Sequence, residues 1–272
     1  KLRYTPLQFR FLGIEEENSP YYKIFKEHDN INGMKVIIGE LHSMLLPVVF
    51  NLKRENPNLR ITYIMTDGGA LPINFSKNVA YLKEKNLIQG TITFGQAFGG
   101  DYEAVNIYTA LLGAKYILKS DITIITMGPG ITGTGTKYGF TGIEQGNIID
   151  ATNTLGGTPV FIPRISFADK RSRHYGISHH SLTILNEIAK TKTYLFIPLF
   201  LEEDNKYIKT QIKSYEIDKK HNIVFMQNSK EILNNILHFN DIELTTMGRN
   251  IEQDKEFFIT AGAPGYYCSK TL

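Results

Sequence analysis

The chain has 272 residues, of which 42% are hydrophobic and 21% charged; this is the composition of a globular protein with a substantial core and excludes a disordered chain. The formal net charge of +3 is too small to indicate nucleic acid as a partner, and the single cysteine, Cys268, excludes an internal disulfide framework and fits a cytoplasmic location. No apolar run approaches the roughly 20 residues of a membrane span and no secretory signal is visible, so we expect no membrane partner.

Residues 1–34 predict an N-terminal edge segment. Residues 2–12 are mixed and contain Pro6, which indicates an edge strand and a loop. The three glutamates at 15–17 are typical of a solvated face, although they could also ligate a cation. Ser19-Pro20 then caps and opens a short helix. Because the chain begins with Lys1 rather than Met, we expect an upstream segment to precede it.

Strands and helices alternate from residue 35 to about residue 246. The predicted strands are 35–41, 60–65, 91–94, 121–126, 158–165, 193–201, 222–226 and 242–246. Helical patterns lie between them, and one of these helices opens near Pro47. This alternation predicts an α/β fold, with a single doubly wound, mostly parallel sheet and helices on both faces, in one domain over residues 1–272. No element is predicted for the tail around 261–265.

A glycine-rich loop, residues 127–146, is the feature around which we expect the rest of the chain to be organised. Seven glycines fall between Gly128 and Gly146, and such a loop between a strand and a helix can direct several N–H groups at one anion. It is not a P-loop, and its Gly-x-Gly-x-x-Gly match lacks the expected acidic residue, so an ordinary structural loop is the alternative. The candidate ligand-binding residues are Gly128, Gly130, Gly133, Thr134, Gly135 and Thr136.

Every unusual polar cluster follows a predicted strand. In order, these clusters are His42 with Ser43, Asp67, Gln96 with Asp101, the glycine-rich loop, and the segment 164–174. Ligands of open α/β sheets bind outside the carboxyl ends of the strands, so we expect all five clusters to line one crevice. Plainer alternatives exist: Asp67 as a turn residue, Asp101 as a helix cap and His42 as an ordinary loop histidine.

His174, His179 and His180 form the densest histidine group and are candidates for proton transfer. Adjacent histidines at a helix start do not easily share a face, and the His-x-x-x-His spacing of zinc proteases is absent. A metal site would need His42, Asp67 or Asp101 to join them, so we assign no metal ligands. The candidate catalytic residues are therefore His42, Asp67, Asp101, His174, His179 and His180.

The segment 164–174 is also rich in positive charge. Arg164, Arg171 and Arg173 have the planar guanidinium that suits phosphate and carboxylate, and they would stand opposite the glycine-rich loop. With Ser43 and Gln96 they complete the candidate ligand-binding set and predict an anionic small molecule as partner. A solvated basic loop is the alternative.

Several motifs together resemble a known family. They are Leu2-Arg-Tyr-Thr-Pro6, Glu15-Glu-Glu17, Leu41-His-Ser43, Met65-Thr-Asp-Gly68, Gly95-Gln-Ala-Phe-Gly-Gly-Asp101, Met127-Gly-Pro-Gly130, Gly142-Ile-Glu-Gln-Gly146, Gly176-Ile-Ser-His-His-Ser181 and Thr246-Met-Gly-Arg249. Nearly the whole chain resembles the bacterial family catalogued as domain of unknown function 3866. The resemblance implies an upstream small β-rich domain and carries over no activity, cofactor or catalytic residue.

The first functional hypothesis is a cytoplasmic enzyme acting on a phosphorylated or nucleotide-like small molecule held by the glycine-rich loop. The second is a metal-dependent hydrolase that uses His42, Asp67, Asp101 and the histidines of the 174–180 segment. The third is a non-catalytic ligand sensor. The sequence assigns no cofactor and leaves a homo-oligomer open.

Overall fold

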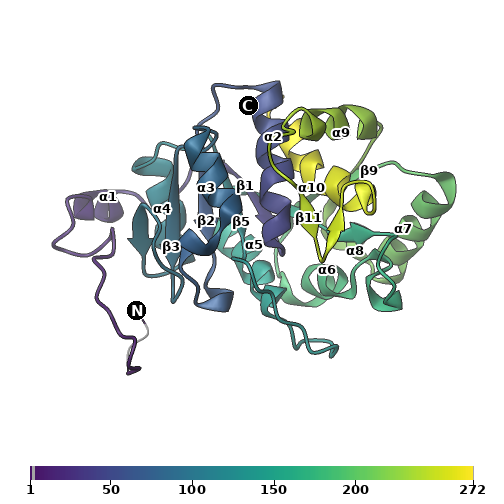
Figure 1. The fold of residues 1–272 in the computed structure, drawn as a ribbon. Coiled ribbons are helices and arrows are strands. Elements are labelled where there is room, and N and C mark those ends of the chain that lie inside the picture. Colours follow the sequence, from purple (N-terminus) through teal and green to yellow (C-terminus); the bar gives the residue numbers. More distant parts are fainter. Residues whose placement is uncertain (2–3, 272) are drawn as a thin grey trace.

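The computed structural model of the chain describes residues 1 and 4–271, with all of their side chains except that of Asp67. Its centre is an eight-stranded parallel sheet in the order β10-β9-β6-β1-β5-β2-β3-β4 (Figure 1). The strands are β1 (Lys35–Gly39), β2 (Ile61–Met65), β3 (Gly90–Phe94), β4 (Tyr102–Ala104), β5 (Ile122–Thr126), β6 (Thr158–Ile162), β9 (Tyr194–Pro198) and β10 (Asn222–Met226). The predicted α/β class with a single doubly wound, mostly parallel sheet is confirmed.

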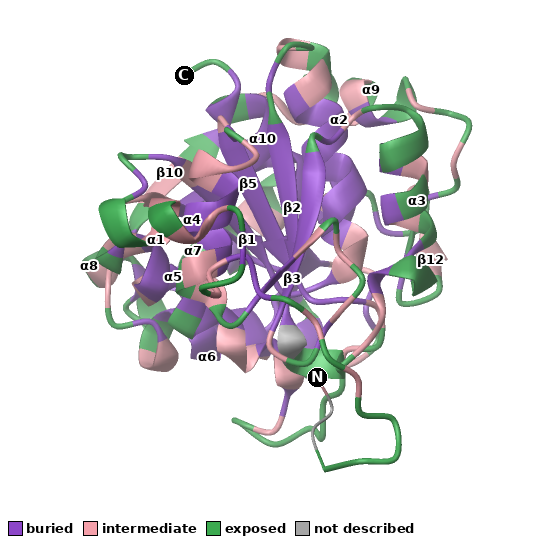
Figure 2. Ribbon diagram, turned by 90° about the vertical axis from the view of Figure 1, so that its left-hand side faces the viewer, coloured by how far each residue is buried: buried purple, intermediate pink, exposed green. Residues whose placement is uncertain are grey.

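Helices cover both faces of the sheet, as Figure 2 shows by the buried strands between them. One face carries α2 (Leu45–Glu55), α3 (Lys77–Glu84), α9 (Ser229–Leu237) and α10 (Lys255–Cys268). The other carries α4 (Ile107–Tyr116), α5 (Glu144–Thr154), α6 (His179–Thr183), α7 (Glu202–Ser214) and α8 (Ile217–Lys220). The short α1 (Tyr22–Glu27) contacts α4. Central strands such as β2 and β5 are buried along their whole length, which explains their unbroken runs of β-branched and other apolar residues.

The tail folds into α10, a helix that the sequence analysis did not predict. Its small residues let it approach α2 closely: a Cβ added to Gly265 would lie 2.4 Å from the carbonyl oxygen of Val48, and one added to Gly262 would lie 2.5 Å from Nδ2 of Asn51. Glycine and Pro264 look like helix breakers in sequence. Tertiary packing outweighs that local cost, because most of α10 is buried.

Three smaller differences concern the edges of the fold. In the described part of residues 2–12 there is no strand. The predicted strand at 242–246 lies outside the large sheet: only β11 (Thr245–Thr246) forms, and it pairs antiparallel with β12 (Arg249–Asn250). Met247 and Gly248 both have positive φ, as a tight two-residue hairpin turn requires. A second hairpin, β7 (Ile165–Ser166) with β8 (Gly176–Ile177), encloses the basic segment.

The topology creates a switch point at β1. The chain leaves β1 through α2 on one face, whereas it leaves the neighbouring strand β5 through α5 on the other face. The connection after β6, on the other side of β1, also runs over the α5 face. A crevice therefore forms outside the carboxyl end of β1, where ligands of open α/β sheets bind. Among the described residues, every helix is too short or too polar to cross a bilayer.

Candidate functional site

Glu40 follows β1 directly and is completely buried at the switch point. Its Oε1 accepts a hydrogen bond of 2.7 Å from the Ser181 hydroxyl, which in turn accepts one of 2.9 Å from the backbone N–H of Arg164. Oε2 of Glu40 has no hydrogen-bond partner among the described residues. Burial raises the pKa of the Glu40 carboxyl, while Arg164 and Ser181 act in the opposite direction. A carboxyl whose pKa is raised in this way is suited to general acid–base chemistry.

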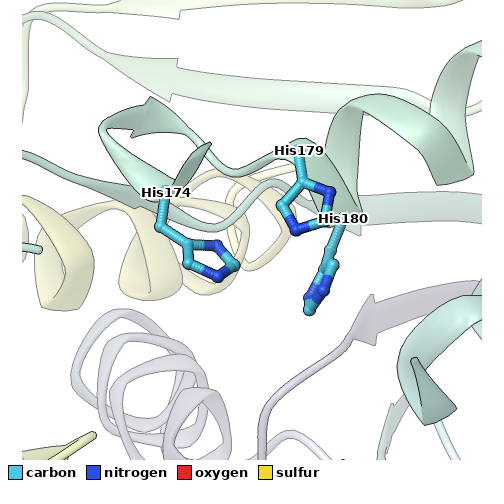
Figure 3. Close-up of side chains that lie close together, drawn as sticks. All are labelled: His174, His179 and His180. Carbon is cyan, nitrogen blue, oxygen red and sulfur yellow. The ribbon is translucent and has the colours of Figure 1, made fainter. Parts of the chain in front are cut away.

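Three histidines lie close together, as Figure 3 shows, and Nδ1 of one of them, His180, is 3.7 Å from Oε2 of Glu40. The ligand atoms of His174, His179 and His180 all lie within 4.8 Å of one another. Ser178 caps α6 by accepting a hydrogen bond from the backbone N–H of His180, and its hydroxyl lies 2.7 Å from Nδ1 of His174. The expectation that adjacent histidines at a helix start would diverge was therefore wrong. His179 and His180 are the first two residues of α6, directly after its N-cap Ser178, and their ring centroids lie 4.3 Å apart.

The surroundings of the three imidazoles keep them neutral. Burial, followed by neighbouring positive charges including Arg164, lowers the pKa of both His174 and His180 to about 3. The pKa of His179 is lowered for the same reasons. Nδ1 of His180 lies 3.7 Å from Oε2 of Glu40, and neither atom has a hydrogen-bond partner in the described structure.

A network of arginine–aspartate ion pairs lies close to the histidines. Asp169 receives hydrogen bonds from Arg164 (2.9 Å) and Arg171 (2.8 Å), and Arg249 bonds to buried Asp254 (2.8 Å). The Arg171 guanidinium holds the pKa of Asp169 well below its usual range. Two arginines predicted to bind an anion, Arg164 and Arg171, are thus already paired with Asp169.

Arg173 differs from the other two predicted arginines. It is exposed, and it makes no hydrogen bond or ion pair with any residue that the structure describes. A Cβ added to Gly135 would lie 3.9 Å from its Cζ, so this guanidinium stands against the glycine-rich loop. Arg173 is the predicted arginine that can still bind an external anion.

The glycine-rich loop lies over the histidines. An antiparallel bridge joins Gly133 to Phe140, and the Phe140 ring stacks on the His180 ring at 3.9 Å between centroids. A Cβ added to Gly133 would lie 3.2 Å from Cε1 of His180, so glycine is needed for this close approach. The hydroxyls of Thr134 and Thr136 bond to each other within the loop (2.9 Å).

Other predicted loop residues have structural reasons to be glycine. Gly130 and Gly135 have φ of +97° and +81°, which side chains rarely adopt. A Cβ added to Gly128 would lie 3.0 Å from Sδ of Met65. These positions shape the loop, and the structure adds no direct evidence for an anion at them.

His42 lies at the same edge of the sheet as the glycine-rich loop. Its Nδ1 is 3.2 Å from the carbonyl oxygen of Met127, and its Nε2 is 2.6 Å from the Ser76 hydroxyl. Burial lowers its pKa to about 4. Ser43 bonds to the Thr246 hydroxyl at 3.0 Å. His42 therefore holds the start of the loop in place, and both its ring nitrogens already have partners.

Two predicted residues lie away from the histidines. Asp101 directly precedes β4 and accepts hydrogen bonds from Thr91, near the start of the parallel strand β3, so it lies at the amino ends of the strands. The prediction that Asp101 lies in the crevice at the carboxyl ends of the strands is therefore wrong, because residues 95–101 lead the chain back to the amino ends. Gln96 lines a different cavity, next to Lys1 and Glu103. Asp67 begins a short 3-10 helix after β2, and its side chain is outside the described ones.

The sequence analysis missed the residue at the centre of the site. Glu40 was not a candidate, and neither were Ser181 nor Asp254. A signal for Glu40 was present: an acidic residue directly follows the apolar run of β1, where it can be buried only with partners. Ser181 and Asp254 act through contacts distant in sequence, which no local pattern shows.

Comparison with known proteins gives a family and no activity. The model of the family described as "Protein of unknown function (DUF3866)" matches residues 1–265. Neither the curated proteins nor the solved structures include a match to this chain.

Proposed function

The chain belongs to the DUF3866 family, and from that premise we propose that it is an enzyme that transfers protons on a small anionic molecule. The proposed substrate class is the phosphorylated or nucleotide-like one expected from the sequence. The proposed site is the crevice at the carboxyl end of β1.

One observation carries this proposal: Oε2 of Glu40 and Nδ1 of His180 face each other at 3.7 Å, both buried and both without a hydrogen-bond partner in the described structure. A buried polar atom without a partner destabilises a fold by about 1–3 kcal/mol. Protein folds rarely retain two such atoms side by side unless a ligand or ion uses them. A carboxyl with a raised pKa is suited to general acid–base catalysis, and the neutral imidazole beside it can form a hydrogen bond with the carboxyl or with a ligand.

The preference for an anion rests on Arg173. Its guanidinium lies beside Gly135, at the outer side of the histidines, and carries a positive charge that no described residue pairs. A phosphate or carboxylate held there would place the rest of a small molecule toward His179 and His180. Replacing Arg173 with alanine should weaken binding of a phosphate ester, and Arg54→Ala, another exposed arginine, is the matched control.

The enzyme proposal is tested through Glu40. Small molecules that co-purify with the full chain are identified by mass spectrometry, and p-nitrophenyl phosphate and bis(p-nitrophenyl) phosphate serve as chromogenic probes. Glu40→Gln should lower turnover by about 10²–10⁴-fold, the usual contribution of a general acid or base. Glu243→Gln, which changes an exposed carboxylate, should leave it unchanged. Full turnover by Glu40→Gln contradicts the proposal, and stoichiometric binding without turnover favours the sensor.

A second candidate, the metal-dependent hydrolase, is favoured by the convergence of the three histidines. The ligand set that the sequence predicted for such a hydrolase needs revision, however. His42 already has partners on both ring nitrogens, and Asp101 lies at the opposite ends of the strands. Any such enzyme would depend on His174, His179 and His180.

A further inference from the structure

We propose that His174, His179 and His180 form a binding site for one divalent transition-metal ion of the zinc class. The binding itself stands on the histidine geometry alone. The ion's part in a reaction rests on the proposed function, where it would serve the same crevice as Glu40.

The three histidines form a donor set suited to a transition-metal ion. Each histidine offers one ring nitrogen, and the three nitrogens lie within 4.8 Å of one another. Tetrahedral zinc bonds to histidine nitrogens at 2.0–2.1 Å, which places two such nitrogens roughly 3.3 Å apart. Small rotations of the three rings close that difference. Imidazole nitrogens suit zinc, copper, iron and nickel, whereas magnesium and calcium prefer oxygen ligands.

Two ring nitrogens in this cluster have no hydrogen-bond partner among the described residues. Nε2 of His179 and Nδ1 of His180 are buried and accept or donate no hydrogen bond within the described structure. A histidine cluster that served packing alone would be expected to bond these atoms to neighbouring groups. On His174 the Ser178 hydroxyl occupies Nδ1, which leaves Nε2 for an ion.

Neighbouring groups hold the histidine rings in place. Ligating histidines are usually oriented by a hydrogen bond or packing contact on the side away from the ion. Ser178 provides that contact for His174, and the stacked Phe140 ring fixes the plane of His180.

The local charge must also accept a cation. Arg164 is buried close to the histidines and shares the single negative charge of Asp169 with Arg171, so Asp169 balances one of their two positive charges. Arg173 is exposed, so water screens its charge. Glu40 is the remaining buried acidic group beside the rings, and its negative charge offsets that of an ion.

Three protein ligands are the number found in catalytic zinc sites, which keep a further position open. A zinc ion there supplies Lewis-acid chemistry to a bound substrate. Glu40 would then hold or release a proton beside it, and Arg173 would bind the anionic group of the substrate.

The test uses the full chain freed of metal with EDTA and then titrated with Zn²⁺ or Co²⁺. The retained metal is measured by mass spectrometry after desalting, and Co²⁺ reports its ligands through its visible absorption. We expect one ion per chain. His179→Ala should weaken Zn²⁺ binding by more than about 100-fold, because even changes in groups that only orient a ligand cost 10–100-fold. His238→Ala, an exposed histidine on another element, is the matched control and should bind normally.

His179 is the residue to change because it is only partly buried, whereas His174 and His180 are buried and their loss could disturb folding. Circular dichroism confirms that the variant is folded before titration. Absence of metal from the wild-type chain, or equal binding by His179→Ala and His238→Ala, overturns the proposed site. Turnover without metal overturns the ion's part in the reaction alone. Normal Zn²⁺ binding with full turnover in Glu40→Gln contradicts only the proposed function.

Discussion

Asp169 is the most informative single position for the stability of the site. Its side chain, only 3% exposed, pairs with the Arg164 side chain, which is 4% exposed, and with that of Arg171, which is 41% exposed. Asp169→Asn keeps the shape and removes the negative charge. Leaving Arg164 buried and unpaired costs about 3–5 kcal/mol, whereas the exposed Arg171 pair adds at most about 1 kcal/mol. Because the new amide oxygen can still accept one hydrogen bond, we expect a loss of about 3 kcal/mol.

Urea denaturation measures this loss as a shift of the midpoint at constant slope. Asp241→Asn is the control, because Asp241 pairs with Lys85 at the surface and its loss should leave the midpoint nearly unchanged. The pKa of Asp169 is lowered by folding, so its contribution is full above the unfolded value near 3.9 and is lost as pH falls through the folded pKa. Equal midpoints for the two variants would refute the view that Asp169 is the buried counter-charge of Arg164.

Three further predictions concern other parts of the fold. Gly265→Val should lower the free energy of unfolding by about 3 kcal/mol in the same urea experiment, since its Cβ would meet the Val48 carbonyl. Gly248→Ala has open space around its Cβ and should cost only the roughly 1–2 kcal/mol of an alanine at positive φ. The His42 ring should show no NMR titration above about pH 5, because its pKa in the folded protein is about 4. This pKa lies below the unfolded value of 6.5, so the stability that His42 contributes is full above pH 6.5 and is lost as the pH falls toward 4. His42→Gln should remove this pH-dependent loss of stability. Gly133→Val should reduce turnover, because the valine side chain would press on the His180 ring. The melting temperature should stay nearly unchanged, because Gly133 lies in an exposed loop. Turnover equal to that of the wild-type chain would show that the loop does not position the His180 ring.

The sequence predicted the parts of the fold that repeat locally. The buried strands β1, β2 and β5 are apolar runs bounded by polar turns, so their place in a parallel sheet followed from pattern alone. The helix α10 did not follow: no element was predicted for the tail, where Gly262 and Gly265 weaken a helix locally but allow its close contact with α2.

The functional site was likewise predicted only in part from the sequence. His42 and the glycine-rich loop were expected at one edge of the sheet, and they meet there because both directly follow parallel strands. Asp101 was misplaced because the return of the chain before β4 looks, in sequence, like the end of a strand. The position of Glu40 after an apolar run was a local signal, but its partners Ser181 and His180 lie some 140 residues away and only the fold shows them.

The close packing of α10 on α2 also bears on how the chain folds during synthesis. The two helices are separated by roughly 200 residues, so their contact can form only after most of the sheet has been made. Until residues 255–268 leave the ribosome, the apolar surface that α2 gives to α10 has no cover. Exposed apolar surface of this kind is what makes partly folded chains of larger proteins prone to aggregation.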